Sequence, residues 1–108
     1  MIARKRIAIE SSRLAENDMD ELEKRNTFAW AVALSMMKVA ASGHRPKDVK
    51  WGRLEGLESI SFQAHQKDGK ESGRLIFRRT KEAVEIIAVS DDHDDAYRKA
   101  RARVKPKR

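Results

Sequence analysis

The chain has 108 residues, of which 24 are Lys or Arg and 17 are Asp or Glu, so its formal net charge is +7 at pH 7. This length suffices for one domain with a buried core, and we expect a single domain over residues 1–108. The absence of cysteine excludes disulfides and thiolate zinc sites and is compatible with the cytoplasm, where we expect the protein. No apolar run approaches the ~18 residues of a membrane span, and the N-terminus has no signal-peptide pattern, so we expect no membrane partner.

The positive charge is concentrated near the C-terminus. Residues 97–108 hold seven Lys or Arg and no acid, whereas the other 96 residues hold 17 bases and 17 acids. We expect a basic tail at about 98–108. Such a tail suits nucleic acid or an acidic protein partner, and it is also compatible with a solvated end that only aids solubility.

The first part of the chain predicts a short strand followed by two helices. Residues 4–10 alternate in polarity as a strand does, and Ser11 or Ser12 can cap a charged helix that ends near Arg25. The thin apolar stripe of this helix consists of Ala15, Met19 and Leu22. Asn26 or Thr27 can cap the second helix.

Residues 28–41 predict a strongly apolar second helix, which Gly43 ends. One face holds Phe28, Val32, Met36 and Val39, and another holds Trp30, Leu34 and Met37. A helix this apolar is either enclosed in the core or partly reserved for a partner. The connection over 44–57 then surrounds Trp51 with basic residues, a pattern that fits nucleic-acid contact or simple packing of Trp51 on a sheet edge.

Three strands are predicted next, at 59–65, 74–79 and 83–90. In the second of them Leu75 and Phe77 point to one face, and Arg74 and Arg78 to the other. The third is apolar on both faces, as a central strand is. Asp92 or a neighbouring aspartate can cap a final helix from 94 to about 104.

This order predicts an α+β fold, with a two-helix hairpin on one face of a small, mainly antiparallel sheet and a short C-terminal helix. The opposite face of the sheet would expose Ser61, Gln63, His65, Arg74 and Arg78. Guanidinium groups match phosphates in a fork geometry, so a polyanion is the first ligand to consider.

Five features in fixed order resemble the RelE/ParE toxin superfamily. They are RLEGL at 53–57, an alternating strand, GRLIFR at 73–78, AVS at 88–90 and AYR at 96–98. The resemblance implies the RelE-like fold and the toxin of a type II toxin-antitoxin system. RelE-like members are endoribonucleases that cleave mRNA in the ribosomal A site without a metal or other cofactor. The partners it implies are a cognate antitoxin, the ribosome and mRNA, and the antitoxin could bind the apolar helix at 28–41.

The resemblance also implies roles for individual residues. Arg74 would contact the scissile phosphate, Tyr97 would orient the ribose 2′-OH or stack on a base, and His93 would transfer a proton. The wider RNA contacts that we expect are Lys47, Lys50, Arg53, His65, Arg78, Arg98, Arg101 and Arg103.

Two departures keep other functions open. RelE carries lysines on the strand that corresponds to 59–64, where this chain has Ser59, Ser61 and Gln63. The turn at 91–95 is acidic where the family is often basic, and its carboxylates would repel RNA unless they cap the helix and pair with Arg78 or Arg79. ParE-like members share the fold but poison DNA gyrase, and a non-catalytic member would act by binding protein. A metal site in this acidic turn lacks a second ligand cluster, so we expect none.

Overall fold

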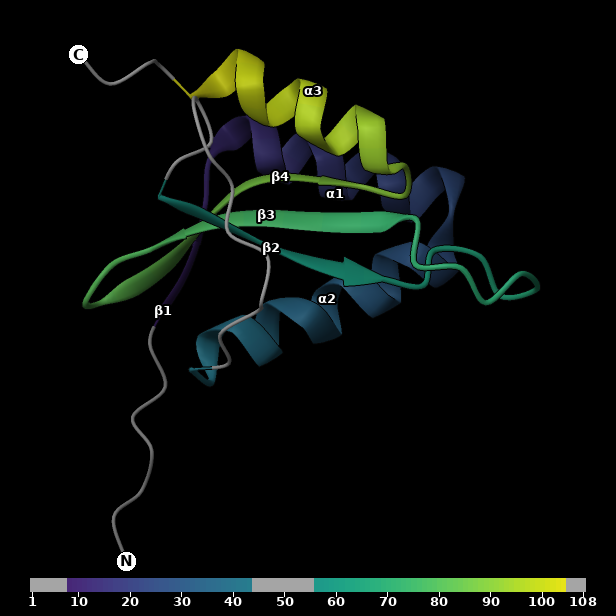
Figure 1. Cartoon of the computed structure of the whole chain (residues 1–108), viewed down its shortest axis with the longest axis horizontal. Coiled ribbons are helices and arrows are strands. Elements are labelled where there is room, and N and C mark those ends of the chain that lie inside the picture. The colour runs from purple at the N-terminus through teal and green to yellow at the C-terminus, as the bar shows by residue number, and fades with distance from the viewer. Residues whose placement is uncertain (1–7, 44–55, 105–108) are drawn as a thin grey trace, which may run out of the picture.

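The protein is described by a computed structural model that covers residues 8–43 and 56–104. Its elements in chain order are β1 (Ala8–Ser11), α1 (Arg13–Arg25), α2 (Thr27–Ala41), β2 (Leu57–Phe62), β3 (Gly73–Arg79), β4 (Ala83–Ser90) and α3 (His93–Arg103) (Figure 1). The predicted α+β class and order of elements are confirmed. Lys47, Lys50 and Arg53 lie outside the described residues, as does the start of the predicted first strand.

The strands form a four-stranded sheet in the order β1-β4-β3-β2. β1 runs parallel to β4, and the other two neighbouring pairs are antiparallel, so the sheet is mainly antiparallel as predicted. β4 is an interior strand, which explains why it is apolar on both faces. A bulge opposite Ile76 and Phe77 turns two successive residues of β4, Ile87 and Ala88, toward the same face of the sheet.

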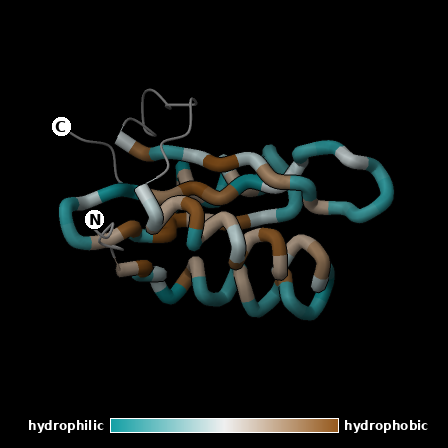
Figure 2. The backbone as a smooth tube through the Cα atoms, turned by 90° about the horizontal axis from the view of Figure 1, so that it is seen from below, coloured by the Kyte–Doolittle hydropathy of each residue, from teal (hydrophilic) through white to brown (hydrophobic). Residues whose placement is uncertain are grey.

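Helices cover both faces of this sheet. α1 and α2 pack on one face, around a core that includes Leu22, Phe77 and Ile86, while α3 packs on the middle of the other face, against Ile76 and Ala88. The strands between these layers are largely hydrophobic, whereas the loops at the two ends of the sheet are hydrophilic (Figure 2). Within the described ranges, no helix combines the length and the apolar character needed to cross a membrane.

Each helix begins at a side-chain cap, at the position that the sequence predicts. The side chains of Ser12, Asn26 and Asp92 accept hydrogen bonds from the backbone N–H three residues later, at 3.1, 3.1 and 2.9 Å. Gly43, with φ of +98°, follows the end of α2 in the left-handed region that favours glycine.

The buried face of α2 consists mainly of small residues. Its innermost residues are Ala29, Ala33, Met37 and Ala40, whereas Phe28, Val32, Met36 and Val39 are only partly buried. The small alanines let the helix lie close to the sheet, which leaves the larger apolar side chains on its flanks. Leu34 is 37% exposed. The helix therefore presents an apolar flank beyond the core that it helps to form.

Candidate functional site

The candidate site lies on the α3 side of the sheet, at the end where β3 begins. Ser61, Arg74 and Ser90 are direct neighbours across β2, β3 and β4 and form one row of the sheet. The next row is Ser59, Ile76 and Ala88. α3 begins three residues after Ser90, so its first turns lie above these two rows. This placement brings the three predicted catalytic residues into one region of the molecule.

Arg74 carries a positive charge that no carboxylate within residues 8–43 or 56–104 neutralises. Its Nη1 donates to two backbone carbonyls, Glu71 O of the preceding loop at 2.5 Å and Gly73 O at the start of β3 at 2.9 Å. The other two arginines of β3 each have a carboxylate partner. These ion pairs are Arg78–Glu85 at 3.4 Å and Arg79–Glu58 at 3.1 Å. Because its charge is not offset by such a pair, Arg74 is suited to bind an anion.

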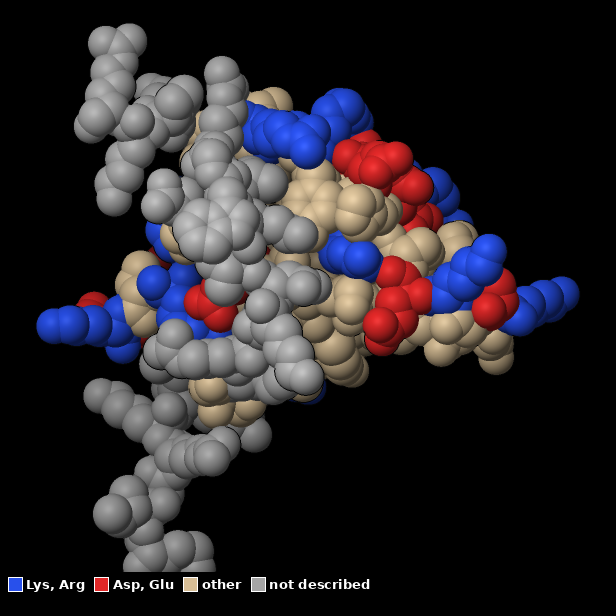
Figure 3. Space-filling model, in the orientation of Figure 1, with Lys and Arg blue, Asp and Glu red and all other residues tan. Residues whose placement is uncertain are grey.

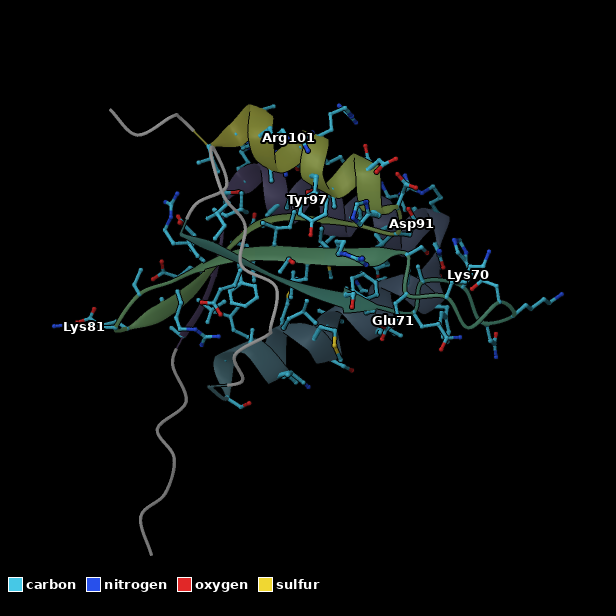
Figure 4. The ribbon with its side chains drawn as sticks, viewed as in Figure 1. Lys70, Glu71, Lys81, Asp91, Tyr97 and Arg101 are labelled. Atoms are coloured by element: carbon cyan, nitrogen blue, oxygen red, sulfur yellow. The ribbon has the colours of Figure 1, made fainter. Side chains whose placement is uncertain are left out.

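Tyr97 is more enclosed than the sequence indicates. It points from α3 toward the sheet (Figure 4), it is only 5% exposed, and its hydroxyl lies 3.1 Å from Ser59 Oγ. Tyr97 and α3 cover Ser59, which is 1% exposed. The Tyr97 side chain is therefore fixed by its burial and by the contact of its hydroxyl with Ser59.

His93 is the first residue of α3 and packs against the ring of Tyr97. The two ring centroids are 4.7 Å apart and the planes are inclined at 69°, an edge-to-face contact. The His93 side chain is 48% exposed, and its Nδ1 lies 2.9 Å from Asp94 Oδ1. That contact favours a proton on Nδ1, which leaves Nε2 as the ring nitrogen able to exchange a proton with a substrate.

The acidic turn that precedes α3 is occupied by structural contacts. Asp91 pairs with Arg25 at 2.9 Å and accepts from Asn26 at 3.2 Å, and Asp92 caps the helix. Arg78 and Arg79, which the sequence offered as partners for these acids, pair with Glu85 and Glu58. The acids are thus largely committed to fixing α3 and its connection to α1.

Asp95 is the acid of this turn that lies closest to the candidate site. Its Oδ2 accepts from the Ser90 hydroxyl at 2.9 Å and lies 3.2 Å from Lys99 Nζ, and the carboxylate also pairs with Arg98. Burial raises the pKa of Asp95, but these hydrogen bonds and the charge of Lys99 outweigh that effect and hold the pKa below its ordinary value. Asp95 is therefore ionised at neutral pH.

Comparison with known proteins identifies the architecture. No family model matches the sequence, and no curated protein matches it. Among solved structures, a mutant of the E. coli toxin RelE in its free state is similar, with a TM-score of 0.64 at 14% sequence identity. The match covers 94% of this chain and 100% of that one. The chain has a RelE-like fold.

The remaining predicted RNA-binding residues are dispersed over this RelE-like fold. Arg78, Arg98 and Arg101 are exposed, although the first two have carboxylate partners. His65 is exposed in the β2–β3 loop, because β2 ends at Phe62 and not at 65 as predicted. The basic tail expected at 98–108 begins as part of α3, so its first arginines are held on a helix.

The described part of the RelE-like fold is not uniformly basic. It holds 14 Lys or Arg and 15 Asp or Glu, so 10 of the 24 basic residues but only 2 of the 17 acids belong to the other segments. Acidic and basic side chains are interspersed over the visible surface of α3 and the β2–β3 loop (Figure 3). An anion would accordingly be recognised at local sites such as Arg74 and not across a continuous basic face of these ranges.

Two other features complete the description of this face. Among residues 8–43 and 56–104, no group of three or more His, Asp or Glu is placed to hold a metal ion. A cavity of about 370 Å³ lies on the same side of the sheet as Arg74, at the other end. Its lining includes Leu14, Ile87 and Val104 together with the paired Arg78 and Glu85.

One buried charged residue was not predicted from the sequence. Asp18 of α1 is 5% exposed and forms ion pairs with Lys99 and Arg103 of α3. Arg103, which we expected to bind RNA, is therefore engaged inside the fold. The available signal was the position of Asp18, three residues after Ala15 and four before Leu22, which places an acid on the apolar stripe of α1.

Proposed function

We propose that this protein is a toxin of a type II toxin-antitoxin system that cleaves mRNA in the ribosomal A site without a metal. The observation that carries the proposal is Arg74, a guanidinium that no carboxylate of the described ranges neutralises, on the same side of the sheet of a RelE-like fold as the His93–Tyr97 pair. Metal-independent cleavage of RNA needs a cation that stabilises charge on the phosphate and groups that take up and deliver protons, and Arg74 and His93 are residues of these two types.

The proposed reaction is an attack of the ribose 2′-oxygen on the adjacent phosphorus. The O–P bond that forms gives a 2′,3′-cyclic phosphate, and the P–O5′ bond that breaks releases the 5′-hydroxyl of the next nucleotide. Arg74 stabilises the charge that develops on the phosphoryl oxygens. His93 Nε2 takes the proton of the attacking 2′-hydroxyl and returns it to the departing 5′-oxygen, so that no net proton is gained or lost. The Tyr97 ring holds the imidazole in orientation.

The enclosure of Tyr97 changes the role that the family resemblance implies. A residue that is 5% exposed and bonded to Ser59 offers little surface on which a base could stack. We therefore place Tyr97 as the residue that orients His93. Wider docking on ribosomal RNA is assigned to the exposed Arg98 and Arg101 and to Lys47, Lys50 and Arg53, which lie outside the described residues.

The proposed partner in the resting cell is an antitoxin that binds the apolar flank of α2. Trp30 is only partly buried there and Leu34 is exposed, whereas Val32 and Met36 are partly buried on the other flank of the helix. α2 contains no acidic residue, so an amphipathic segment with an acidic edge is the partner that fits this helix.

A second candidate function is inhibition of DNA gyrase by a ParE-like member of the superfamily. It is favoured by the enclosure of Tyr97, which offers an RNA base little surface on which to stack. In that function the α3 side of the sheet would bind protein and Arg74 would not act on a phosphate.

The two candidates are separated by inducing the protein in bacteria while mapping mRNA 5′ ends and assaying gyrase supercoiling. We expect cuts within translated codons, lost in Arg74→Ala and retained in Lys81→Ala. Lys81 is a suitable control because it is an exposed cation at the tip of the β3–β4 hairpin, at the opposite end of the molecule from Glu71 and Asp91 (Figure 4). Intact mRNA with gyrase-dependent DNA breaks would replace the endoribonuclease proposal by the ParE-like one.

A further inference from the structure

A buried carboxylate of α1, Asp18, binds α3 along one side. Its Oδ1 lies 2.9 Å from Arg103 Nη2 and 3.3 Å from Lys99 Nζ. Its Oδ2 accepts from Arg103 Nη1 at 2.7 Å and from Val89 N at 3.2 Å. Both oxygens are thus satisfied, and every one of these partners belongs to α3 or β4. The bidentate contact with Arg103 fixes both the distance between the two side chains and their relative orientation.

The Asp18–Arg103 ion pair also binds the edge of β4 beyond the point where β1 ends. β1 pairs with β4 only over Ala83–Ile86. Beyond that point the Val89 N–H donates to Asp18, and the Ile87 carbonyl accepts from Arg103 at 3.0 Å. The ion pair therefore takes the hydrogen bonds that a longer β1 would have made, and it joins α3 to the edge of the sheet.

The contacts with Asp18 and Asp95 define one side of α3. Asp95, Lys99 and Arg103 recur every four residues, and Lys99 joins the other two through its contacts with Asp95 and Asp18. His93 and Tyr97 lie on a different side of the helix, from which Tyr97 faces the sheet. Because a helix is rigid, fixing the first side fixes the rotation of the second.

α3 buries few apolar side chains against the sheet, so the ion pairs of Asp18 with Lys99 and Arg103 matter for the placement of the helix. The buried residues of α3 are Ala96, Tyr97 and Ala100. Two of these three are alanines, which bury little area and interlock weakly with the sheet. Directional contacts with Asp18 are then the means by which the helix is held in one rotation.

We propose that Asp18 is a positioning residue, which sets the rotation of α3 through Lys99 and Arg103 and thereby places His93 and Tyr97 relative to Arg74. The effect on cleavage rests on the function proposed above. The effect on the placement of α3 does not, because it follows from contacts within the fold and can be measured without a substrate.

The test compares Asp18→Asn with Asp20→Asn, an exposed acid of the same helix. Amide hydrogen exchange of α2 and α3 is measured in both proteins, together with kcat and KM for mRNA cleavage on purified ribosomes. In Asp18→Asn we expect α3 amides to exchange about 10- to 100-fold faster while α2 amides keep their rate, because only the attachment of α3 is weakened. We expect kcat to fall about tenfold or more with KM nearly unchanged, and Asp20→Asn to change neither.

A second variant, Arg103→Lys, keeps the positive charge but loses the bidentate contact with Asp18. It tests the same inference if Asp18→Asn does not fold. We expect faster α3 exchange and a lower kcat in this variant too. Three results would overturn the inference. The first is a folded variant whose α3 amides exchange as slowly as in the wild type, and the second is an equal increase in the exchange rates of α2 and α3. The third is an unchanged kcat in a variant whose α3 amides exchange faster. If the wild-type protein does not cleave mRNA, the proposed function fails, and the exchange data still decide whether Asp18 places α3.

Discussion

Gly73, at the start of β3, leaves no room for a side chain. It lies directly opposite Phe62 of β2, whose ring is almost completely buried in the core beneath α2. A Cβ on residue 73 would lie 2.3 Å from Phe62 Cε2 and 2.6 Å from Cζ, whereas ordinary contacts begin at 3.4 Å. The Gly73→Ala substitution must therefore displace the ring by roughly 1 Å or shift the backbone next to Arg74.

The magnitude is set by two opposing effects. Overpacking a closed core costs about 1 to 3 kcal/mol. Gly73 does not have a positive φ, so alanine can adopt its backbone conformation and gains about 0.4 to 1 kcal/mol from the less flexible unfolded chain. We expect a net loss of about 1 to 2 kcal/mol in unfolding free energy, which lowers Tm by roughly 5 to 15 °C in a domain of this size.

The assay is thermal and urea unfolding, followed by circular dichroism, of Gly73→Ala, Phe62→Leu and the double variant. The smaller leucine makes room for the new methyl group, so the double variant should be at least about 1 kcal/mol more stable than the sum of the single effects indicates. Additive effects, or a Gly73→Ala protein as stable as the wild type, would refute the reasoning from the Phe62 contact.

The contacts around α3 support three further predictions. Asp92→Ala removes the cap and should lower the unfolding free energy by about 1 kcal/mol in urea titrations. An unchanged midpoint would contradict the cap. Because the fold lowers the pKa of Asp95, its stabilisation is present above the unfolded pKa and is lost as pH falls through the lower, folded pKa. The stability difference between wild type and Asp95→Asn should thus be largest near neutral pH and shrink below about pH 4, whereas a pH-independent difference would argue against it. Tyr97→Phe should cost about 1 kcal/mol of unfolding free energy, because it leaves the buried Ser59 hydroxyl without this partner.

The features that the sequence predicted correctly depend on neighbours within a few residues. Ser12, Asn26 and Asp92 cap helices through the backbone three positions away, so their roles are visible in the order of residue types. The side of β3 on which Arg74 lies is likewise set by simple alternation with Leu75. These signals were sufficient for the class of fold and for the residue on which the proposed site is centred.

The features that it missed depend on packing between distant segments. Periodicity showed that α2 is apolar nearly all round, and it could not show that the alanine side would lie against the sheet. The burial of Tyr97 depends on Ser59, 38 residues earlier in the chain, and the pairing of Asp18 with Arg103 spans 85 residues. No local pattern specifies such partners. The assignments of Lys47, Lys50 and Arg53 to RNA binding stay predictions.

The most direct test of the central claim is cleavage of mRNA on purified, programmed ribosomes by the wild-type protein, Arg74→Ala and Lys81→Ala. We expect cuts within the A-site codon by the wild type in the presence of a chelator. We also expect a rate about 100- to 1000-fold lower for Arg74→Ala, because one preorganised group that stabilises transition-state charge is lost, and a rate close to wild type for Lys81→Ala. No cleavage by the wild type, or an equal rate for a folded Arg74→Ala protein, would contradict it.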